Sequence, residues 1–424
     1  MSILSNIKGV KDIFDNEILL FRKIERLFNE ISEKYGYSEM RTAILEYTEL
    51  FSRGIGEFTD IVEKEMFTLT DSKGKKISLR PENTAGVVRS FIQNGLFNLP
   101  GIKKYFYIGP MFRHERPQAG RLRQFHQIGC EAFGADSPII DVECIQYACE
   151  LISGLGIKKY DLQISSVGCP VCRKEYNSRL VSYLYSYKQG LCSNCNQRME
   201  KNPLRVLDCK EGNCQDIIAG APKIVDSLCQ ECSDNFNEIL GILKNSGVNF
   251  SVNKRLVRGL DYYTKTVFEI VCEGLGSQNT VLAGGRYNNL VKQLGGPEIP
   301  AVGWASGIER LVMILSSNGY HNTEGINQKN VFLVYDESVK HEINELLTKF
   351  RKNNIRVLID YECKSFKSQF RLANKLGCEY VLIFGGNEMK SGIIKLKNFS
   401  NGTETEILIT ELIEKIKPLI FYSK

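Results

Sequence analysis

The heptapeptide Arg258-Gly-Leu-Asp-Tyr-Tyr-Thr264 holds residues well suited to bind a small charged ligand. It combines an arginine, a carboxylate and two adjacent tyrosines, and a strand-like segment, Val267-Phe-Glu-Ile-Val271, follows it directly. A guanidinium requires an anion, while two tyrosines offer flat rings and hydroxyl groups to a polar ligand. On its own, the heptapeptide could equally be a turn between two strands with a solvated arginine. Segments elsewhere in the chain favour the ligand site.

Arginines are concentrated upstream, in Phe112-Arg-His-Glu-Arg-Pro117 and Arg121-Leu-Arg-Gln-Phe-His-Gln127, between strand-like Lys104–Ile108 and Gln127–Phe133. A strand–loop–strand of this kind can hold a nucleotide, because guanidinium groups bind phosphate oxygens in pairs. A Phe-Arg-x-Glu sequence alone is usually a solvated surface pair. Here it is followed, in order, by a glycine-rich turn and helix over Gly303–Leu311. The joint occurrence of the two segments makes the indication of a nucleotide site specific.

Together these segments resemble the histidyl-tRNA synthetases, which are class II aminoacyl-tRNA synthetases. Phe-Arg-His-Glu and Gly-Ile-Glu-Arg are similar to motifs 2 and 3 of that class, and Lys8-Gly-Val-Lys-Asp12 and Ser365-Phe-Lys-Ser-Gln-Phe370 extend the likeness to both ends of the chain. The resemblance implies an α+β protein. It would have an antiparallel-sheet catalytic domain with a helical, cysteine-rich insertion, and a C-terminal α/β anticodon-binding domain.

The resemblance also implies a reaction, in which ATP and Mg²⁺ support formation of histidyl-adenylate and the histidine then passes to the 3′ end of tRNA(His). Arg113 and Arg258 would be the catalytic residues. Arg113 would clamp the α-phosphate, and Arg258 would hold the α-phosphate together with the histidine carboxylate. Phe125 would stack on adenine, while Arg310 would reach the terminal phosphates.

For the amino acid, the resemblance implies that Glu131 accepts a hydrogen bond from the imidazole, with Tyr263 as its partner across the ring. Gln127 and Glu131 share strand parity, so both can face one cleft. For Glu131 alone, a carboxylate on an exposed strand edge is the alternative. The implied histidine-binding residues are Glu82, Asn83, Thr84, Arg113, Gln127, Glu131, Arg258, Tyr262, Tyr263 and Tyr287.

Two other functions remain open from these residues. One is a non-catalytic paralogue that senses histidine and regulates ATP phosphoribosyltransferase. The presence of Arg113, Arg258 and Arg310, together with a full terminal domain, argues against it. The other is a prolyl, threonyl or glycyl synthetase, which the Arg258–Thr264 heptapeptide disfavours.

Hydrophobic periodicity places these motifs on regular elements. It predicts helices at 17–35, 85–93 and 141–155 and a strand at 77–79. We expect the catalytic domain at residues 1–168 and 251–315, the insertion at 169–250, a linker at 316–330 and the anticodon-binding domain at 331–424. In that last domain, strands at 331–335, 356–359 and 380–384 alternate with helices, which predicts partly parallel strands.

Eight of the fourteen cysteines lie between Cys169 and Cys232. Three Cys-x-x-Cys pairs and one wider pair permit two tetrahedral zinc sites with four thiolates each. The alternative is that these thiols are packing residues of a small helical insertion that forms without metal. Spacing alone does not show which cysteines meet. The candidate ligands are Cys169, Cys172, Cys192, Cys195, Cys209, Cys214, Cys229 and Cys232.

The resemblance implies two macromolecular contacts, a homodimer and tRNA(His). Motif 1 builds the dimer interface in the family, and this chain has Ala43 where proline is usual. In the loop before Arg121, Arg116 and Gln118 would meet the tRNA acceptor end, and the resemblance implies that Gln118 reads the extra 5′ guanosine of tRNA(His). A basic face in the terminal domain would hold the anticodon stem or be merely solvated. That face consists of Lys364, Lys367, Arg371 and Lys375.

The composition is that of a globular protein, with 43% hydrophobic and 25% charged residues in 424. The net charge of +6 permits a polyanionic partner without requiring one. Neither a membrane span nor a signal peptide is evident, so we expect a cytoplasmic protein.

Overall fold

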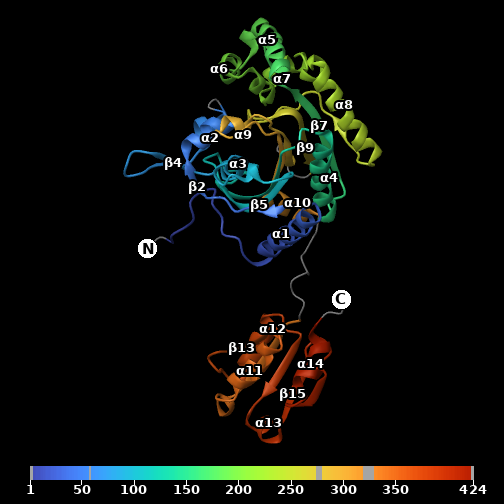
Figure 1. Cartoon of the computed structure of the whole chain (residues 1–424). Helices are drawn as coiled ribbons and strands as arrows, with labels where there is room; N and C mark the ends of the chain where they lie inside the picture. The colour runs from blue at the N-terminus through green and yellow to red at the C-terminus, as the bar shows by residue number, and fades with distance from the viewer. Residues whose placement is uncertain (1–2, 57–58, 274–278, 319–328, 422–424) are drawn as a thin grey trace. The chain divides into compact units, whose positions relative to one another are not determined.

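The computed structural model describes residues 3–56, 59–273, 279–318 and 329–421. It divides the chain into two compact units, Met1–His321 and Asn322–Lys424 (Figure 1). Of the predicted linker at 316–330, residues 319–328 lie outside the described part, and Ser316 and Ser317 form the last turn of α10 (Ile308–Ser317). No helix in the described ranges is long and apolar enough to span a bilayer.

An eight-stranded sheet organises the first unit, with the strand order β1-β5-β6-β11-β10-β9-β7-β8. The central strands pair antiparallel, and only the short edge strands β1 and β8 pair parallel to their neighbours. The predicted antiparallel catalytic sheet is therefore confirmed. The strands are β1 (Ser38–Glu39), β5 (Lys103–Phe112), β6 (Gln124–Phe133), β7 (Tyr160–Gly168), β8 (Ser251–Val252), β9 (Thr264–Cys272), β10 (Thr280–Arg286) and β11 (Ala301–Gly307).

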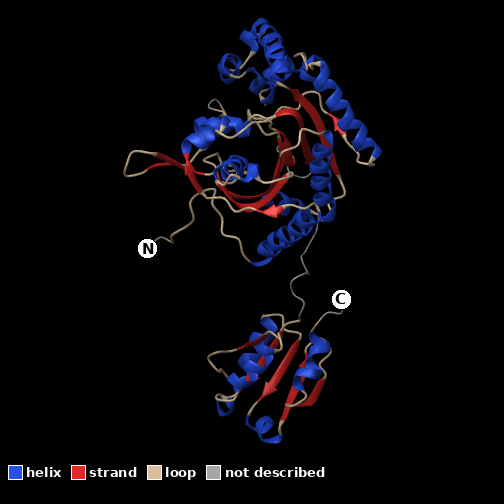
Figure 2. Ribbon diagram, in the orientation of Figure 1, coloured by secondary structure: helices blue, strands red, loops and turns tan. Residues whose placement is uncertain are grey.

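Helices α1 (Asp15–Lys34), α4 (Pro138–Gly154) and α10 pack against one face of this sheet, where their apolar stripes form a single core (Figure 2). Ser137 caps α4 by accepting a hydrogen bond from the backbone N–H of Ile139, which fixes where the helix begins. A buried ion pair between Arg286 and Asp141 joins β10 to the same helix. The opposite face of the sheet is left for the tyrosine cluster and the cavity described below.

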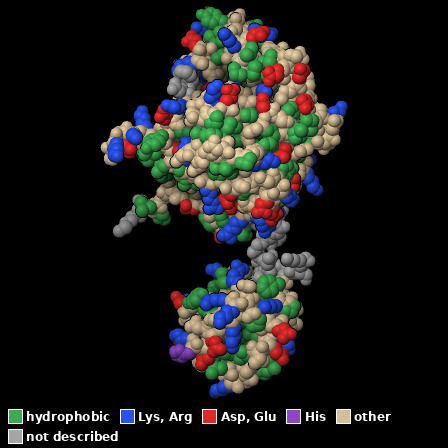
Figure 3. Space-filling view, in the orientation of Figure 1, with side chains coloured by type: hydrophobic (Ala, Val, Ile, Leu, Met, Phe, Trp, Pro, Cys, Tyr) green, Lys and Arg blue, Asp and Glu red, His purple; other side chains and the backbone are tan. Residues whose placement is uncertain are grey.

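A smaller antiparallel sheet, in the order β2-β4-β3, lies beside α2 (Thr48–Ile55), which in turn packs on α3 (Thr84–Gln93). Its strands are β2 (Leu45–Tyr47), β3 (Thr68–Thr70) and β4 (Lys76–Leu79). The η1 turn (Ile61–Glu65) lies between α2 and β3, and α9 (Leu290–Gln293) packs on α2 and α3. Leu45, Tyr47 and Leu69 are 51%, 57% and 59% exposed there. Apolar side chains are visible over this sheet in Figure 3.

Between β7 and β8 the chain forms the helical insertion, built from α5 (Pro170–Ser186), α6 (Ser193–Lys201), α7 (Gly212–Ala219) and α8 (Gln230–Asn245) with the short turns η3 (Lys188–Gly190), η4 (Pro203–Asp208) and η5 (Ile224–Ser227). Tyr176 and Val206 of the insertion lie in one core with Phe91 and Tyr287 of the catalytic domain. Phe236, Ile239 and Leu243 of α8 join the core on the other face of the sheet, against α4. The insertion thus packs against the catalytic domain through both cores.

The second unit is a five-stranded sheet in the order β13-β12-β14-β15-β16. Strand β12 pairs parallel with β13 and β14, whereas β14, β15 and β16 pair antiparallel, which confirms the predicted partly parallel α/β domain. Its elements are β12 (Val331–Tyr335), η6 (Glu337–Val339), α11 (Ile343–Lys352), β13 (Val357–Ile359), α12 (Phe366–Lys375), β14 (Tyr380–Phe384), α13 (Gly386–Ser391), β15 (Ile393–Asn398), β16 (Glu404–Leu408) and α14 (Leu412–Ile420).

Candidate active site and cysteine clusters

One cavity of about 670 Å³ opens on the face of the large sheet that α1, α4 and α10 do not cover. The residues that the sequence assigned to ATP and histidine meet here, although they come from segments almost 230 positions apart. The structure brings together Glu82, Thr84, Arg113, Phe125, Gln127, Glu131, Arg258, Tyr262, Tyr263, Tyr287 and Arg310 in its lining.

Asn83 is also among the predicted histidine-binding residues, but it is buried and lies outside the cavity lining. Its Oδ1 accepts a hydrogen bond from Nη1 of Arg80 at 3.2 Å and another from the hydroxyl of Thr42. The neighbouring Glu82 turns toward the cavity and accepts from the backbone N–H groups of Thr84 and Ala85 at 2.8 and 2.9 Å. Because Glu82 caps α3 from the cavity side, the adjacent Asn83 side chain is directed into the protein behind it.

Glu131 lies at the closed end of the cavity and is 1% exposed. Oγ1 of Thr84 donates to its Oε1 at 2.7 Å, and the hydroxyl of Tyr287 donates to its Oε2. Burial raises the pKa of Glu131 to about 8, although these two hydrogen bonds act in the opposite direction. A neutral imidazole has one donor and one acceptor nitrogen, so it complements this carboxyl in either protonation state.

Strand register explains how so large an acid fits there. Glu131 of β6 is paired with Gly303 of β11, and a Cβ atom at position 303 would lie 1.8 Å from Oε2 of Glu131. Only glycine leaves room for the carboxyl to cross the neighbouring strand. Tyr263, predicted as the partner of Glu131 across the imidazole ring, lines the same cavity, and its ring centroid is 4.8 Å from that of Tyr262. Tyr287 is the tyrosine that contacts Glu131 directly.

Arg258 is held by an ion pair that the sequence analysis missed. Its Nη1 lies 2.9 Å from Oε2 of Glu269 on β9. A charged residue inside the apolar strand Val267–Val271 was the available signal for this partner. Nε of Arg258 and Oε1 of Gln127 are buried without a hydrogen-bond partner in the described part of the chain. Both residues line the cavity, so a donor and an acceptor remain for a polar ligand.

Arg113 and Arg310 are held by backbone carbonyl groups instead of carboxylates. Nε of Arg113 donates to the carbonyl oxygen of Pro81 at 2.9 Å, and its guanidinium lies 5.2 Å from the centre of the Phe125 ring. Arg310 donates to the carbonyls of Gly120 and Thr280 at 3.1 and 2.6 Å. Burial lowers the pKa of Arg310, and the neighbouring arginines lower it further. Neutral carbonyls fix these side chains without cancelling their charge, which suits a site for phosphates.

Arg116 and Gln118 are exposed and lie outside the cavity lining. The backbones of Gln118 and Arg121 exchange hydrogen bonds of 3.1 and 2.9 Å, so the loop tip is a tight turn. The N-terminal segment supports it, since the N–H of Arg123 donates to the carbonyl of Gly9 at 2.7 Å. Gly9 has a φ of +88°, and a Cβ there would lie 2.7 Å from Cγ of Pro117. The loop is thus presented to solvent next to the cavity.

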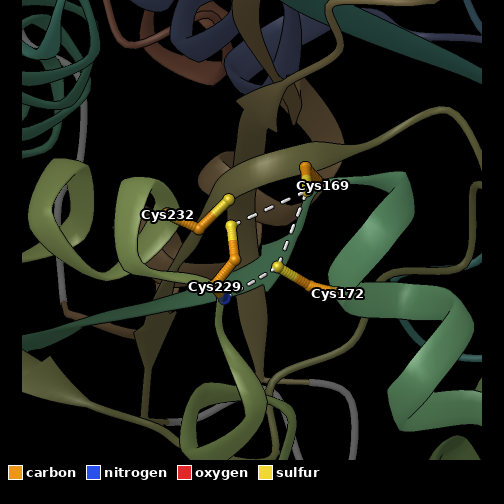
Figure 4. A group of neighbouring side chains, drawn as sticks. All are labelled: Cys169, Cys172, Cys229 and Cys232. Atoms are coloured by element: carbon orange, nitrogen blue, oxygen red, sulfur yellow. Dashed lines mark hydrogen bonds between the residues drawn. The ribbon is translucent and has the colours of Figure 1, made fainter.

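The eight clustered cysteines form two groups, and the structure decides which pairs meet. Cys169 and Cys172, at the start of α5, join Cys229 and Cys232, at the start of α8 (Figure 4). The second group consists of Cys192, Cys195, Cys209 and Cys214. Within each group all four sulfur atoms lie within 4.8 Å of one another. That proximity is what a tetrahedral site with four thiolate ligands requires.

Backbone N–H groups donate to sulfur atoms in both groups. The backbone N–H of Cys229 donates to Sγ of Cys172 at 3.1 Å, and that of Cys192 donates to Sγ of Cys214 at 3.2 Å. Burial nevertheless raises the pKa of the Cys172 and Cys214 thiols. Burial also opposes ionisation of Cys169, yet hydrogen bonds lower the pKa of that thiol to about 7.

The sequence analysis also missed part of the cavity wall, which the insertion supplies. Arg198, Arg205, Leu207, Asp208 and Lys210 all line the cavity. No motif identified them, because they belong to a helical segment without a recognisable pattern of ligand-binding residues.

Comparison with known proteins gives consistent matches over nearly the whole chain. The family described as histidyl-tRNA synthetase matches residues 9–173 and 196–311, and the anticodon binding domain matches residues 312–419. A histidine–tRNA ligase of Caldanaerobacter subterraneus is 45% identical over 413 residues, covering 97% of this chain and 98% of the relative. One from Clostridioides difficile is 44% identical over 412 residues, with the same coverage of both chains.

Two solved structures extend the comparison. The chain is similar to apo histidyl-tRNA synthetase of S. aureus, with a TM-score of 0.81 and 32% identity over 97% of this chain and 99% of the other. It also shares a fold with an ATP phosphoribosyltransferase regulatory subunit/histidyl-tRNA synthetase from Bacillus halodurans, with a TM-score of 0.66 and 19% identity over 91% and 99% of the two chains.

Proposed function

The chain belongs to the histidyl-tRNA synthetase family, and from this premise we propose that it attaches L-histidine to tRNA(His). The first step joins the histidine carboxylate to the α-phosphate of ATP and releases diphosphate. The second step transfers the histidyl group to the 3′ end of the tRNA. One observation carries the proposal: a single cavity holds Arg113, Arg258 and Arg310 beside the buried acid Glu131.

The closed end of the cavity supports histidine as the amino acid. Glu131 and Tyr287 form a buried polar pair with Thr84, and Gln127 keeps a buried oxygen without a partner in the described structure. An imidazole ring at Glu131 would place the α-amino group toward Gln127 and Glu82. An apolar side chain of similar size would leave these buried groups unpaired, which costs about 1–3 kcal/mol for each.

The open end supports ATP. Arg113 and Arg310 keep their charge for phosphate oxygens, and Arg258 lies between this end and the amino-acid pocket, where it can bind both reacting groups. Neutralising the charge that develops on the α-phosphate is a main source of rate enhancement in such a reaction. Mg²⁺ would enter with the nucleotide, since it binds mainly through phosphates and one or two carboxylates. Glu115 and Glu309 line the cavity and fit that requirement.

The same evidence weighs against a histidine-sensing regulatory subunit. The chain covers 98% of a histidine–tRNA ligase at 45% identity and retains all three arginines in one cavity. The likeness to the regulatory subunit/synthetase from Bacillus halodurans concerns the fold alone. A sensor would require neither the phosphate-binding arginines nor the anticodon binding domain.

We propose that tRNA(His) contacts both units of the chain. Arg116 and Gln118, exposed beside the cavity, would meet the acceptor end. In the terminal unit, α12 carries Lys367, Arg371 and Lys375, and Lys364 precedes it, so this helix offers a positive face to the anticodon stem. Both contacts are supported by exposed polar or positively charged side chains, beside the cavity in the first unit and on α12 in the second.

We propose further that the chain forms a homodimer through the small sheet. Ala43 and Ile44 are exposed next to the apolar side chains of Leu45, Tyr47 and Leu69. Contiguous apolar surface of this kind marks an interface. Light scattering behind a sizing column should give twice the chain mass, and Leu45→Asp combined with Leu69→Asp should reduce that mass to one chain.

Each cysteine group is proposed to hold one zinc ion. Four sulfur atoms within 4.8 Å of one another match a closed structural site, and each group accepts a hydrogen bond from a backbone N–H. Elemental analysis of the purified protein should find two zinc ions per chain. Replacing Cys192 and Cys195 by serine should remove one, and replacing Cys169 and Cys172 should remove the other. A folded, active protein without zinc would show that the thiols are packing residues.

ATP–diphosphate exchange with each of the twenty amino acids tests the function. We expect exchange with histidine alone, followed by histidylation of tRNA(His) when the tRNA is added. Exchange with another amino acid would contradict the assignment of the pocket. Absence of exchange with histidine would contradict the function itself.

A further inference from the structure

The insertion contributes one segment to the active site, Asn202–Asp208, which we call the strap. It consists of the end of α6 and the η4 turn, Pro203–Asp208. Arg205 of the strap is 9% exposed, and together with Leu207 and Asp208 it lines the cavity. A segment that belongs to the insertion by sequence thus forms a wall of the catalytic cavity.

The strap contacts the loop that carries Arg258. Nδ2 of Asn202 donates to Oδ1 of Asp261 at 2.8 Å. Arg205 packs so closely on Gly259 that a Cβ atom at that position would lie 3.0 Å from Nη1 of Arg205. The strap therefore contacts this loop at two residues that follow Arg258, namely Gly259 and Asp261.

On its other side the strap is tied to the catalytic domain through Asp60, just before η1. Nη2 of Arg205 lies 2.8 Å from Oδ2 of Asp60, and Nη2 of Arg198 lies 2.9 Å from the same oxygen. Nη1 of Arg205 also lies 3.2 Å from Oδ2 of Asp208. Burial alone would raise the pKa of Asp60, but the two guanidinium groups lower it below its ordinary value. Arg205 thus joins the Asp60 segment, the strap and the Arg258 loop.

The second cysteine group closes the base of the strap. Cys192 and Cys195 precede it on α6, and Cys209 and Cys214 follow it, on either side of the start of α7. Their sulfur atoms meet within 4.8 Å, so the two ends of the strap are held together. The first group joins the starts of α5 and α8 and therefore encloses a longer segment, 172–229, which contains the strap.

We propose that the strap positions Arg258 for histidine activation, with Asn202 and Arg205 as positioning residues and the second cysteine group fixing its base. This inference rests on the proposed function, because Arg258 is taken to bind the histidine carboxylate. Arg258 must hold its guanidinium against two reacting groups, and a displacement of about 1 Å costs on the order of 10²-fold in rate. Glu269 fixes the side chain, while the strap fixes the backbone that follows it.

Arg205→Ala in the full-length protein tests the proposal by histidine-dependent ATP–diphosphate exchange. We expect the KM for histidine to rise by at least ~10-fold, because a displaced Arg258 would bind the histidine carboxylate less well. This factor is smaller than the ~10²-fold loss of rate that a full 1 Å displacement causes. The KM for ATP should stay within about twofold, because the carbonyls of Pro81, Gly120 and Thr280 hold Arg113 and Arg310 independently of the strap. Arg205→Lys, which keeps the charge toward Asp60, should recover part of the loss.

Arg179→Ala is the matched control. It removes an exposed arginine from the same insertion, where Nη1 of Arg179 donates to the hydroxyl of Ser227 at 2.8 Å, away from the cavity. Its exchange kinetics should equal those of the unaltered protein. Asn202→Ala is the second test variant, since it removes only the hydrogen bond to Asp261 and preserves the ion pairs of Arg205. It should shift the KM for histidine in the same direction, by a few-fold.

Thermal unfolding of each variant separates positioning from loss of folded protein. A smaller folded fraction lowers kcat and leaves the KM for histidine unchanged. That result, or unaltered kinetics in both Arg205→Ala and Asn202→Ala, would overturn the role of the strap while the enzyme assignment stands. If Arg205→Ala does not fold, Asn202→Ala decides. An unaltered protein that does not activate histidine would instead contradict the proposed function.

Discussion

The two ends of the candidate active-site cavity offer opposite physical means of binding a ligand. At the closed end, Glu131 is buried, and this burial raises the pKa of its carboxyl although the hydroxyls of Thr84 and Tyr287 donate hydrogen bonds to it. At the open end, Arg113 and Arg310 are fixed by neutral carbonyls and keep their charge. The closed end can select a ligand through buried hydrogen bonds, while the open end can stabilise charge that develops during reaction. Specificity and rate are therefore separable.

Replacing Arg258 should give the largest effect, because we propose that this side chain binds both the histidine carboxylate and the α-phosphate. Arg258→Ala should lower the rate of histidine-dependent ATP–diphosphate exchange by at least ~10²-fold, the usual loss for one electrostatic contact in the transition state. Arg351→Ala, on an exposed face of α11 in the second unit, is a control of equal charge change and should have no effect. Near-normal exchange in the Arg258 variant would remove this residue from the chemistry.

At the closed end, Glu131→Gln should act mainly on histidine binding. The amide keeps the size of the side chain but cannot take up or release a proton toward the imidazole. We expect the KM for histidine to rise by about 10- to 100-fold, the effect of losing a buried hydrogen bond to a titratable group. The KM for ATP should change little. Equal changes in both constants would show that the two ends do not act separately.

The same variant should change how stability depends on pH. In the unfolded chain the carboxyl titrates near ~4.3, whereas burial raises the pKa of Glu131 to about 8 in the folded protein. Between these values the folded state holds a proton that the unfolded state has lost. The contribution of Glu131 to the free energy of unfolding is thus fully present below the lower pKa and is lost as the pH rises to 8, by at most ~1.4 kcal/mol per pH unit.

Glu131→Gln lacks this titration. Urea unfolding at pH 5 and at pH 8 should therefore show the variant gaining stability relative to the unaltered protein as the pH rises. A difference that is independent of pH would mean that Glu131 is ionised throughout. Glu82 is also buried with a raised pKa, but it is present in both proteins and cancels in the comparison.

The smallest effect is expected outside the cavity. Gln118 is exposed on the loop tip and would read a base of the tRNA acceptor end through its amide donor and acceptor. Gln118→Ala should lower aminoacylation of tRNA(His) by a few-fold, narrow the difference between tRNAs with and without an extra 5′ guanosine, and leave adenylation intact. If discrimination between the two tRNAs is unchanged, Gln118 does not read that base. A change in adenylation would show instead that the loop supports the cavity.

Much of this organisation could be predicted from the sequence, because it depends on local chemistry. The apolar period that predicts a helix at 17–35 matches α1, and the strands on either side of the arginine-rich loop match β5 and β6. Side-chain parity on one strand correctly directed Gln127 and Glu131 to the same cleft. Backbone geometry fixes such relations within a few residues, so they can be derived without knowing the fold.

Relations between distant segments were decided only by the tertiary structure. Sheet register set Glu131 against Gly303, the paths of α5 and α8 brought Cys169 and Cys172 to Cys229 and Cys232, and the packing of the insertion placed Arg205 between Asp60 and the Arg258 loop. Asn83, predicted to bind histidine, lies outside the cavity lining, and its amide oxygen accepts hydrogen bonds from Arg80 and Thr42. The sequence alone determined which chemical groups are present and which local elements carry them. Which of these groups meet depended on the packing of elements far apart in the chain, because spacing along a chain does not specify distance in space.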